Sequence, residues 1–410
     1  MEAEAQCPRC GRKIPWGQKD CPFCASHGWY SWSQRRDTFL LMIIVLLVLM
    51  FAITSFTVRN YFEDEKAFAE EWYTRGEQDL QAKRLVAALA DFRTALSYSH
   101  NNPQYQLRLA QALARAEDSE ETRAEARTYL LSLLEREPGN GVVNLELARL
   151  ATREGDVSDA LRYYHGAIYG AWTDHQVAKR RAARLELVQF LLDVGQKEAA
   201  RAELIAMAPD LPADPVLQTR VGNLLLRVQG YDDALKLFQR ALLEDPRLPA
   251  ALAGAGECHF QQGNYARAER YLTKAVQQDP SLVDAARMRD TARAILNLDP
   301  FGRHLSNLER ARRAAMDFKT AVARLASCAG EKGIDLKASG GNRMQILSAE
   351  ARELQPRAQQ RYLSRDPELL SHVMDVVFET EQTTAHACGQ PHGQDFSLLL
   401  IAQEQGGSHP

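Results

Sequence analysis

The sequence lacks the short motifs that build most recognisable catalytic sites. Its 410 residues contain no GxSxG nucleophile elbow, no HExxH metal-binding helix and no GxxxxGK[ST] phosphate loop. A glycine-rich dinucleotide turn and a CxxCH haem-attachment run are also absent. Because nothing in the pattern assembles a reacting centre, we predict that the protein is not an enzyme.

Charge of one sign is lacking as well. The 50 Lys and Arg residues are balanced by 53 Asp and Glu residues, which leaves a net charge of -3. So balanced a chain has no strong field of either sign, and we expect neither nucleic acid nor an anionic membrane surface as a partner. With 45% hydrophobic and 25% charged residues, the composition is that of a folded protein long enough for two or three domains.

Cysteines are few, and four of the seven lie close to the start, in Cys7-Pro8-Arg9-Cys10 and Cys21-Pro22-Phe23-Cys24. Two CxxC pairs at this spacing can direct four thiolates at one tetrahedral Zn²⁺. The segment resembles the zinc-ribbon modules found at the ends of many bacterial proteins, except that Ala25 stands where a second glycine is common. We predict a ribbon and linker at 1–36 that hold one structural zinc ion; two disulfides in an exported tail are the alternative.

An uncharged stretch of 21 residues, Thr38 to Val58, follows this module. Fourteen of its residues are Leu, Ile, Val or Phe, each worth roughly 0.3 to 0.6 kcal/mol of insertion free energy, or about 6 kcal/mol together. The stretch is long enough for one transmembrane helix at 38–58. A cleaved signal peptide is the alternative, but the apolar run is too long and a 37-residue tail precedes it.

The basic residues beside this stretch predict its orientation. Three lie on each side within about 20 residues, but Arg35 and Arg36 adjoin its start, and the tail holds six in total. Free thiolates are also better preserved in a reducing cytoplasm. We therefore expect a single-pass protein of the bacterial inner membrane with a cytoplasmic N-terminus; the reverse topology is the alternative. The aromatic residues expected at the interfaces are Trp29, Tyr30, Trp32, Tyr61 and Phe62.

From Trp72 onward, small and aromatic residues recur with a period near 34. In the two clearest units, Gly222, Ala234, Phe238, Ala241 and Pro246 recur 34 residues later as Gly256, Ala268, Leu272, Ala275 and Pro280. Helical spacings within each unit, with Gly230 and Gly263 at the turns, predict pairs of antiparallel helices. The pattern resembles tetratricopeptide repeats. This resemblance implies an all-α fold, a helix-turn-helix solenoid.

The same frame extends backward with declining regularity. It predicts six units over about 69–282 and a capping helix to Leu298, so the predicted array covers 69–298, outside the cytoplasm. Small residues such as Gly222 and Ala234 let two helix backbones approach closely. Replacing Ala234 with Leu is therefore expected to overpack the core, at roughly 1 to 3 kcal/mol.

In tetratricopeptide repeats the concave surface, lined by the first helices, usually binds a peptide or a protein. The outward positions of the first helices give a partly basic strip, which we predict to bind a partner: Arg108, Arg115, Arg149, Arg153, Arg220, Asn223 and Arg227. Arginine pairs bidentately with carboxylates, so an acidic segment or a carboxy terminus is the expected ligand. Glu77, Glu146, Glu186 and Glu257 interrupt the basic strip, and a solvated helix face is the alternative.

After Asp299-Pro300 the 34-residue frame ends, while helical patterns continue at 305–325, 343–363 and 367–379. We predict a helical extension over 300–410. In an oxidising compartment Cys328 and Cys388 are predicted to form a disulfide worth around 4 kcal/mol. The alternative is a metal site of Cys388 with His386 and His392, which lacks a fourth ligand. Cys258, in the sixth unit, is expected to be buried.

Together these patterns predict an adaptor. It is a membrane-anchored scaffold that recruits or assembles envelope proteins through its repeat groove, with a zinc ribbon as its cytoplasmic foot. The alternative is an enzyme or a cofactor-binding protein whose active part lies in residues 300–410.

Overall fold

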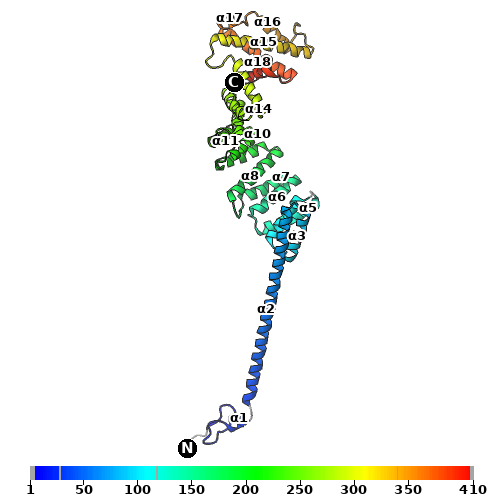
Figure 1. Ribbon diagram of the computed structural model, residues 1–410, viewed down its shortest axis with the longest axis vertical. Helices are drawn as coiled ribbons and strands as arrows, with labels where there is room; N and C mark the ends of the chain where they lie inside the picture. The colour runs from blue at the N-terminus through cyan, green and yellow to red at the C-terminus, as the bar shows by residue number, and fades with distance from the viewer. Residues whose placement is uncertain (1–4, 27–28, 117–118, 339, 407–410) are drawn as a thin grey trace. The chain divides into compact units, whose positions relative to one another are not determined.

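The computed structural model describes residues 5–26, 29–116, 119–338 and 340–406, without the side chains of 26, 29–37 and 406 (Figure 1). These residues form nineteen α-helices and one 3-10 helix, and their only extended pairing is two isolated β-bridges. The chain divides into two compact units, Met1–Ala183 and Arg184–Pro410. The predicted all-α class is confirmed.

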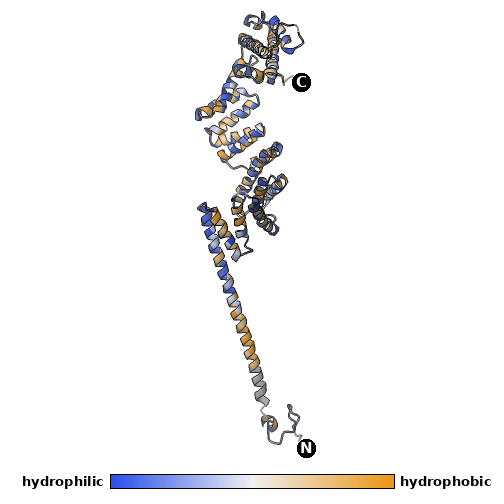
Figure 2. Cartoon of the chain, turned by 90° about the vertical axis from the view of Figure 1, so that its right-hand side faces the viewer, coloured by the Kyte–Doolittle hydropathy of each residue, from blue (hydrophilic) through white to orange (hydrophobic). Residues whose placement is uncertain are grey.

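The first unit holds one exceptionally long helix. Its helices are α1 (Pro22–Ser26), α2 (Trp29–Gln81), α3 (Leu85–Tyr98), α4 (Pro103–Arg115), α5 (Glu120–Arg136), α6 (Gly141–Glu154) and α7 (Val157–Tyr169). Helix α2 runs for 53 residues, so the apolar stretch and the first helix of the first repeat are one element (Figures 1 and 2). The helix continues because residues 59–71 contain neither proline nor glycine.

The boundary between the two units falls inside α8 (Gln176–Asp193). The second unit continues with α9 (Lys197–Met207), the 3-10 helix (Ala208–Asp210), α10 (Pro215–Arg227), α11 (Tyr231–Glu244), α12 (Pro249–Gln261), α13 (Tyr265–Gln278) and α14 (Val283–Leu298). The six predicted pairs run from the end of α2 with α3 to α12 with α13, and the two helices of the first, second, third, fifth and sixth pairs contact each other. Helix α14 lies where a capping helix was predicted, but it does not end the stack, because Ala292 and Ile295 share one apolar core with the C-terminal extension.

Three glycines let the two helices of a pair approach closely. Each faces a large buried side chain sixteen residues later, so a methyl group added to the glycine would overlap it. The pairs are Gly76 with Phe92, Gly222 with Phe238 and Gly256 with Leu272, where an added Cβ would fall 2.6, 2.7 and 2.6 Å from the side chain. The repeated small residues in the sequence are therefore contacts between helices.

The turns inside the first, third, fourth, fifth and sixth pairs share one backbone geometry. A residue with positive φ ends the first helix, and the next N–H bonds the carbonyl five residues before it, as Gly230 does to Leu225 at 2.9 Å. The positive-φ residues are Lys83, Gly155, Gly195, Gln229 and Gly263, with φ of 60, 75, 79, 56 and 71°. Gly230, which lies in the turn as predicted, is the N-cap of α11 with φ of -82°, and the residue before it, Gln229, adopts the left-handed conformation.

The C-terminal extension packs on the last repeats. Its helices are α15 (Asn307–Glu331), α16 (Arg343–Leu354), α17 (Gln360–Leu363), α18 (Pro367–Cys388) and α19 (Gly393–Gly406). The predicted helix 343–363 is broken after Leu354 because Pro356 cannot continue it. Helix α19, which the sequence reading missed, buries Leu398 and Ile401 in the same core as Leu272 of α13. One apolar core therefore joins the sixth repeat to the extension.

Candidate metal centre and interaction surfaces

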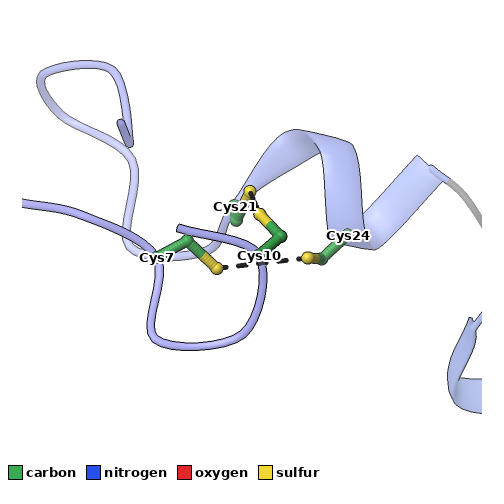
Figure 3. Close-up of side chains that lie close together, drawn as sticks. All are labelled: Cys7, Cys10, Cys21 and Cys24. Carbon is green, nitrogen blue, oxygen red and sulfur yellow. Dashed lines mark hydrogen bonds between the residues drawn. The ribbon is translucent and has the colours of Figure 1, made fainter. Parts of the chain in front are cut away.

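The candidate metal centre consists of Cys7, Cys10, Cys21 and Cys24, whose sulfur atoms all lie within 4.8 Å of one another (Figure 3). The Cys7 and Cys24 sulfurs are 4.0 Å apart, and those of Cys10 and Cys21 are 3.6 Å apart. All four are free thiols, so the alternative pairing as two disulfides does not occur. A tetrahedral ion with bonds of about 2.3 Å to sulfur needs sulfurs about 3.8 Å apart, which this cluster matches.

Two different turns bring the sulfurs together. In the first, the N–H of Gly11 donates to the Cys7 carbonyl at 2.9 Å, and Gly11 has φ of 70°, where a side chain is disfavoured. In the second, Cys21 leads into α1, and the N–H of Ala25 donates to the Cys21 carbonyl at 3.1 Å. A helical turn closes this half, so Ala25 replaces the expected glycine without strain.

The backbone prepares the cluster for a cation. The N–H groups of Arg9 and Cys10 hydrogen-bond the Cys7 sulfur and lower its pKa to about 7. The hydrogen bond with the Cys10 sulfur raises the pKa of Cys24 to about 12, and a bound cation would favour its thiolate form. Four sulfurs leave no open coordination position. The residues can therefore hold a metal ion structurally, without presenting it to a substrate.

The carboxy-terminal cysteines are joined. Cys328 of α15 and Cys388 at the end of α18 form a disulfide, with sulfurs 1.95 Å apart and Cα atoms 5.9 Å apart. Beside it, Arg324 donates to the Thr384 hydroxyl at 3.0 Å and to the Gly389 carbonyl at 3.1 Å. A bonded Cys388 is not available to a metal, which excludes the alternative site with the two histidines. Cys258 is fully buried, and burial raises its pKa to about 12.

Helix α2 carries the apolar stretch. From Thr38 on, it is the one helix among the described residues that is long and apolar enough to cross a membrane. None of the side chains from Phe39 to Val58 is covered by protein. Of the expected interfacial residues, Tyr61 and Phe62 are exposed just beyond the stretch. The side chains of Trp29, Tyr30 and Trp32 lie outside the described residues.

The first four predicted partner-binding arginines lie in the first unit, where two of them belong to a polar ladder across the first helices. The Nη2 atom of Arg108 donates to Glu77 at 2.6 Å, and its Nη1 atom donates to the Gln111 amide oxygen at 3.1 Å. Gln111 and Arg149 both donate to Glu146, at 3.0 and 3.1 Å. The strip is therefore alternately charged and not uniformly basic. Arg115 and Arg153 are exposed, and Arg153 donates to the Ala114 carbonyl.

The other three predicted residues, Arg220, Asn223 and Arg227, lie in the second unit. All are exposed on α10, and they fall at helical spacings of three and four on one face. Arg227 donates to the Gln189 amide oxygen at 3.4 Å. Within this unit the structure places these three side chains on one face of the first helix of the fifth pair.

Sequence reasoning missed several buried polar groups. Asp317 and Glu381 are fully buried, and their carboxylate oxygens have no hydrogen-bond partner. Burial raises the pKa of each to about 8. His259 is 3% exposed, and its Nδ1 atom has no partner. Their positions in the sequence could have indicated their burial. Asp317 interrupts the apolar stripe of α15, and His259 stands 34 residues after Leu225, at the equivalent position of the next repeat.

Comparison with known proteins agrees with the helix-pair architecture. Residues 221–283 match the family model described as tetratricopeptide repeat, and this stretch runs from the middle of α10 to the end of α13, where the 34-residue frame is most regular. The array is thus an all-α solenoid of tetratricopeptide type. No curated protein matches the chain.

Several solved structures resemble part of this chain. One is the C-terminal part of a TPR repeat-containing protein from Cytophaga hutchinsonii, with 14% identity, 56% of this chain and 96% of that chain covered, and a TM-score of 0.42. PilF from Pseudomonas aeruginosa shows 13% identity, coverage of 55% and 98%, and a TM-score of 0.39. PilW, titled a type IV pilus biogenesis factor, shows 16% identity, coverage of 53% of this chain and 97% of that chain, and a TM-score of 0.37. At these values the likenesses carry no conclusion about function.

Proposed function

We propose that this protein is a membrane-anchored scaffold that binds a protein partner along the first helices of its repeats. The main support for this proposal is the structure of helix α2. An uncovered apolar stretch at 38–58 lies in one uninterrupted helix between the cysteine cluster and the repeats. An exposed apolar helix of this length is stable in a lipid bilayer, whereas its exposure to water costs free energy. The continuous helix would hold the first repeat close to the bilayer surface.

The state of the cysteines supports the orientation. Four free thiols lie before the apolar stretch, and a disulfide lies far beyond it. Thiols persist in the reducing cytoplasm, whereas disulfides persist in oxidising compartments. We therefore place the N-terminal cluster, loaded with one zinc ion, in the cytoplasm of a bacterial cell. The repeats and the extension then lie on the outer side of the inner membrane.

The exposed polar residues on the first helices support partner binding. Because Arg108 and Arg149 are held by glutamates, the arginines more accessible to a ligand are Arg115, Arg220 and Arg227. Guanidinium groups bind carboxylates bidentately, and Asn223 adds an amide on the same face of α10. An acidic segment or a carboxy terminus of an envelope protein is the ligand that this chemistry favours.

Topology is tested with alkaline phosphatase, which is active only outside the cytoplasm. The enzyme fused after Pro410 is expected to be active in cells, and the enzyme fused before Met1 is expected to be inactive. The opposite pattern would overturn the proposal and place the repeats in the cytoplasm.

Partner binding is tested by site-specific crosslinking in native membranes. A photo-reactive residue at position 223 is expected to give a discrete adduct that disappears in the Arg220→Glu/Arg227→Glu variant. The same residue at position 236, on the second helix of that pair, serves as the control. Identical adducts from both positions would show that the first-helix surface is not the binding site.

A further inference from the structure

A second surface of the repeat array has the properties of a binding site. A cavity of about 450 Å³ opens between the second helices of the fifth and sixth pairs, α11 and α13, with α12 beneath. Its lining includes Gln239 of α11, His259 of α12, and Arg267, Arg270, Tyr271 and Lys274 of α13. The predicted groove residues of this unit, Arg220, Asn223 and Arg227, lie on the first helix α10, so the cavity is a separate site in the second unit.

Most of the charges around the cavity are positive. Arg267, Arg270 and Lys274 are exposed and fall three and then four residues apart, on one face of α13 over about 10 Å. The acidic residue on the rim, Glu269, is engaged by Arg293 at 2.7 Å, and this hydrogen bond lowers its pKa. The cavity therefore presents three cations, while its one carboxylate is already paired.

The floor of the cavity holds an unsatisfied polar group. His259 is 3% exposed, its ring centroid lies 5.5 Å from that of Tyr271, and its Nδ1 atom has no hydrogen-bond partner. In the preceding repeat the equivalent residue is Leu225, which is fully buried. A leucine is therefore sufficient to fill this space, and packing does not require a histidine. A buried nitrogen without a partner costs stability, and a ligand can remove that cost.

The field at this histidine suits an anion. Burial lowers the pKa of His259, and the charges of Arg267 and Arg270 lower it further. An anion between these side chains would offset the two arginine charges and bring oxygen atoms to the ring. The three cations follow two turns of a helix and do not converge on one point, which suits several separate carboxylates better than one phosphate. Carboxylates on alternate residues of an extended peptide lie about 7 Å apart.

We propose that the cavity between α11 and α13 binds an acidic peptide segment of a partner protein. Its carboxylates accept hydrogen bonds from Arg267, Arg270 and Lys274, and the ring of His259 bonds the ligand at the floor. The scaffold would then hold two ligands, one on its first helices and one on its second helices.

The first test measures binding of a fluorescent hexaglutamate peptide to the full-length protein in nanodiscs of zwitterionic lipid, by anisotropy at low salt. Arg267→Glu/Arg270→Glu is expected to weaken binding at least tenfold. The matched control, Lys236→Glu/Arg247→Glu, changes the net charge equally with exposed cations outside the cavity. No binding to the unmodified protein, or equal losses in both variants, would overturn the proposal.

A second test concerns the histidine. His259→Leu copies the residue of the preceding repeat and is expected to retain the melting temperature, weaken peptide binding at least threefold, and abolish one peptide-induced shift among the histidine ring resonances. Unchanged affinity with no such shift would remove His259 from the site and overturn the assignment. Displacement of the peptide by inorganic phosphate at lower concentration would show a phosphate site instead.

The proposals for the two surfaces can be refuted independently of each other. Arg220→Glu/Arg227→Glu is expected to leave hexaglutamate affinity unchanged. Loss of binding in that variant, with retention in Arg267→Glu/Arg270→Glu, would move the peptide to the first-helix groove and overturn only the cavity proposal.

Discussion

Arg108 of α4 donates hydrogen bonds to both carboxylate oxygens of Glu77, which lies in the last turns of α2. The two side chains are 30% and 22% exposed, and the pair lowers the pKa of Glu77. The contact therefore fastens the second repeat to the helix that carries the apolar stretch. A bidentate, half-buried pair of this kind contributes more to stability than an exposed one.

The first prediction concerns this pair. Glu77→Gln and Arg108→Gln are each expected to lower the local unfolding free energy by about 1 to 3 kcal/mol, because each leaves a hydrogen-bonded charge without its partner. The double variant is expected to show a coupling energy of about 1 kcal/mol, measured by hydrogen exchange of amides in α2 to α4. The exposed pair Arg287 and Asp284, changed in the same way, should couple by less than about 0.5 kcal/mol. Equal coupling in both pairs would contradict this role.

The second prediction concerns the metal. Purified full-length protein is expected to carry one zinc ion per chain, measured by elemental mass spectrometry against protein concentration. Cys21→Ser should lose the ion, since three sulfurs cannot complete the tetrahedron. Cys258→Ser removes a buried cysteine elsewhere and should retain it. Zinc-free unmodified protein, or loss of zinc in both variants, would argue against the four-cysteine site.

The third prediction tests the glycine contacts between paired helices. Gly222→Ala is expected to lower the unfolding free energy by about 1 to 3 kcal/mol, because the new methyl group would overlap the ring of Phe238. Gly330 is exposed in the last turn of α15, and a Cβ added there would have nothing within 4 Å, so Gly330→Ala should be neutral or slightly stabilising. Thermal unfolding followed by circular dichroism measures both. A stable Gly222→Ala variant would mean that Phe238 can move aside.

The fourth prediction is a pH dependence of the C-terminal helices. In the unfolded chain, Asp317 and Glu381 lose their protons near pH 4, whereas burial raises their pKa to about 8 in the folded chain. The folded state keeps protons that the unfolded state has lost, so stability falls as pH rises from about 4 to about 8 and then levels off.

The corresponding measurement is the melting temperature at pH 5 and pH 8. It should be higher at pH 5, and Asp317→Asn should raise the value at pH 8 and reduce the difference. Asp375 is exposed on α18, and Asp375→Asn should leave the profile unchanged. If Asp317→Asn behaves like this control, the Asp317 carboxyl is not protonated in the folded state.

The fifth prediction counts thiols. Protein denatured without reductant, in the presence of a zinc chelator, is expected to label at five cysteines, namely Cys7, Cys10, Cys21, Cys24 and Cys258. Reductant should expose two more, Cys328 and Cys388. Loss of this bridge, by Cys328→Ser/Cys388→Ser, is expected to destabilise the extension by about 4 kcal/mol, because its ends lie 60 residues apart. Seven labelled thiols before reduction would contradict the disulfide.

The spacing of residues in the sequence was sufficient to predict contacts that are local or that recur in each repeat. The 34-residue frame located the helix pairs because packing in each pair needs the same small residue at the same place, as Gly222 and Gly256 show. Two CxxC motifs marked the cysteine cluster because metal ligation fixes residue type and spacing together. Spacing did not reveal that Gln229 takes the left-handed turn position, since the capping hydrogen bonds tolerate a side chain there.

By itself the sequence determined the apolar stretch at 38–58, the paired cysteines and the helical repeats, because each depends on residues whose order along the chain dictates their contacts. Only the tertiary structure decided which polar groups are buried or paired. Asp317, His259 and the glutamate partner of Arg108 meet neighbours from distant helices, and burial depends on what those helices cover. The physical reason is that charge and desolvation act through space, whereas periodicity records only the helix on which a residue lies.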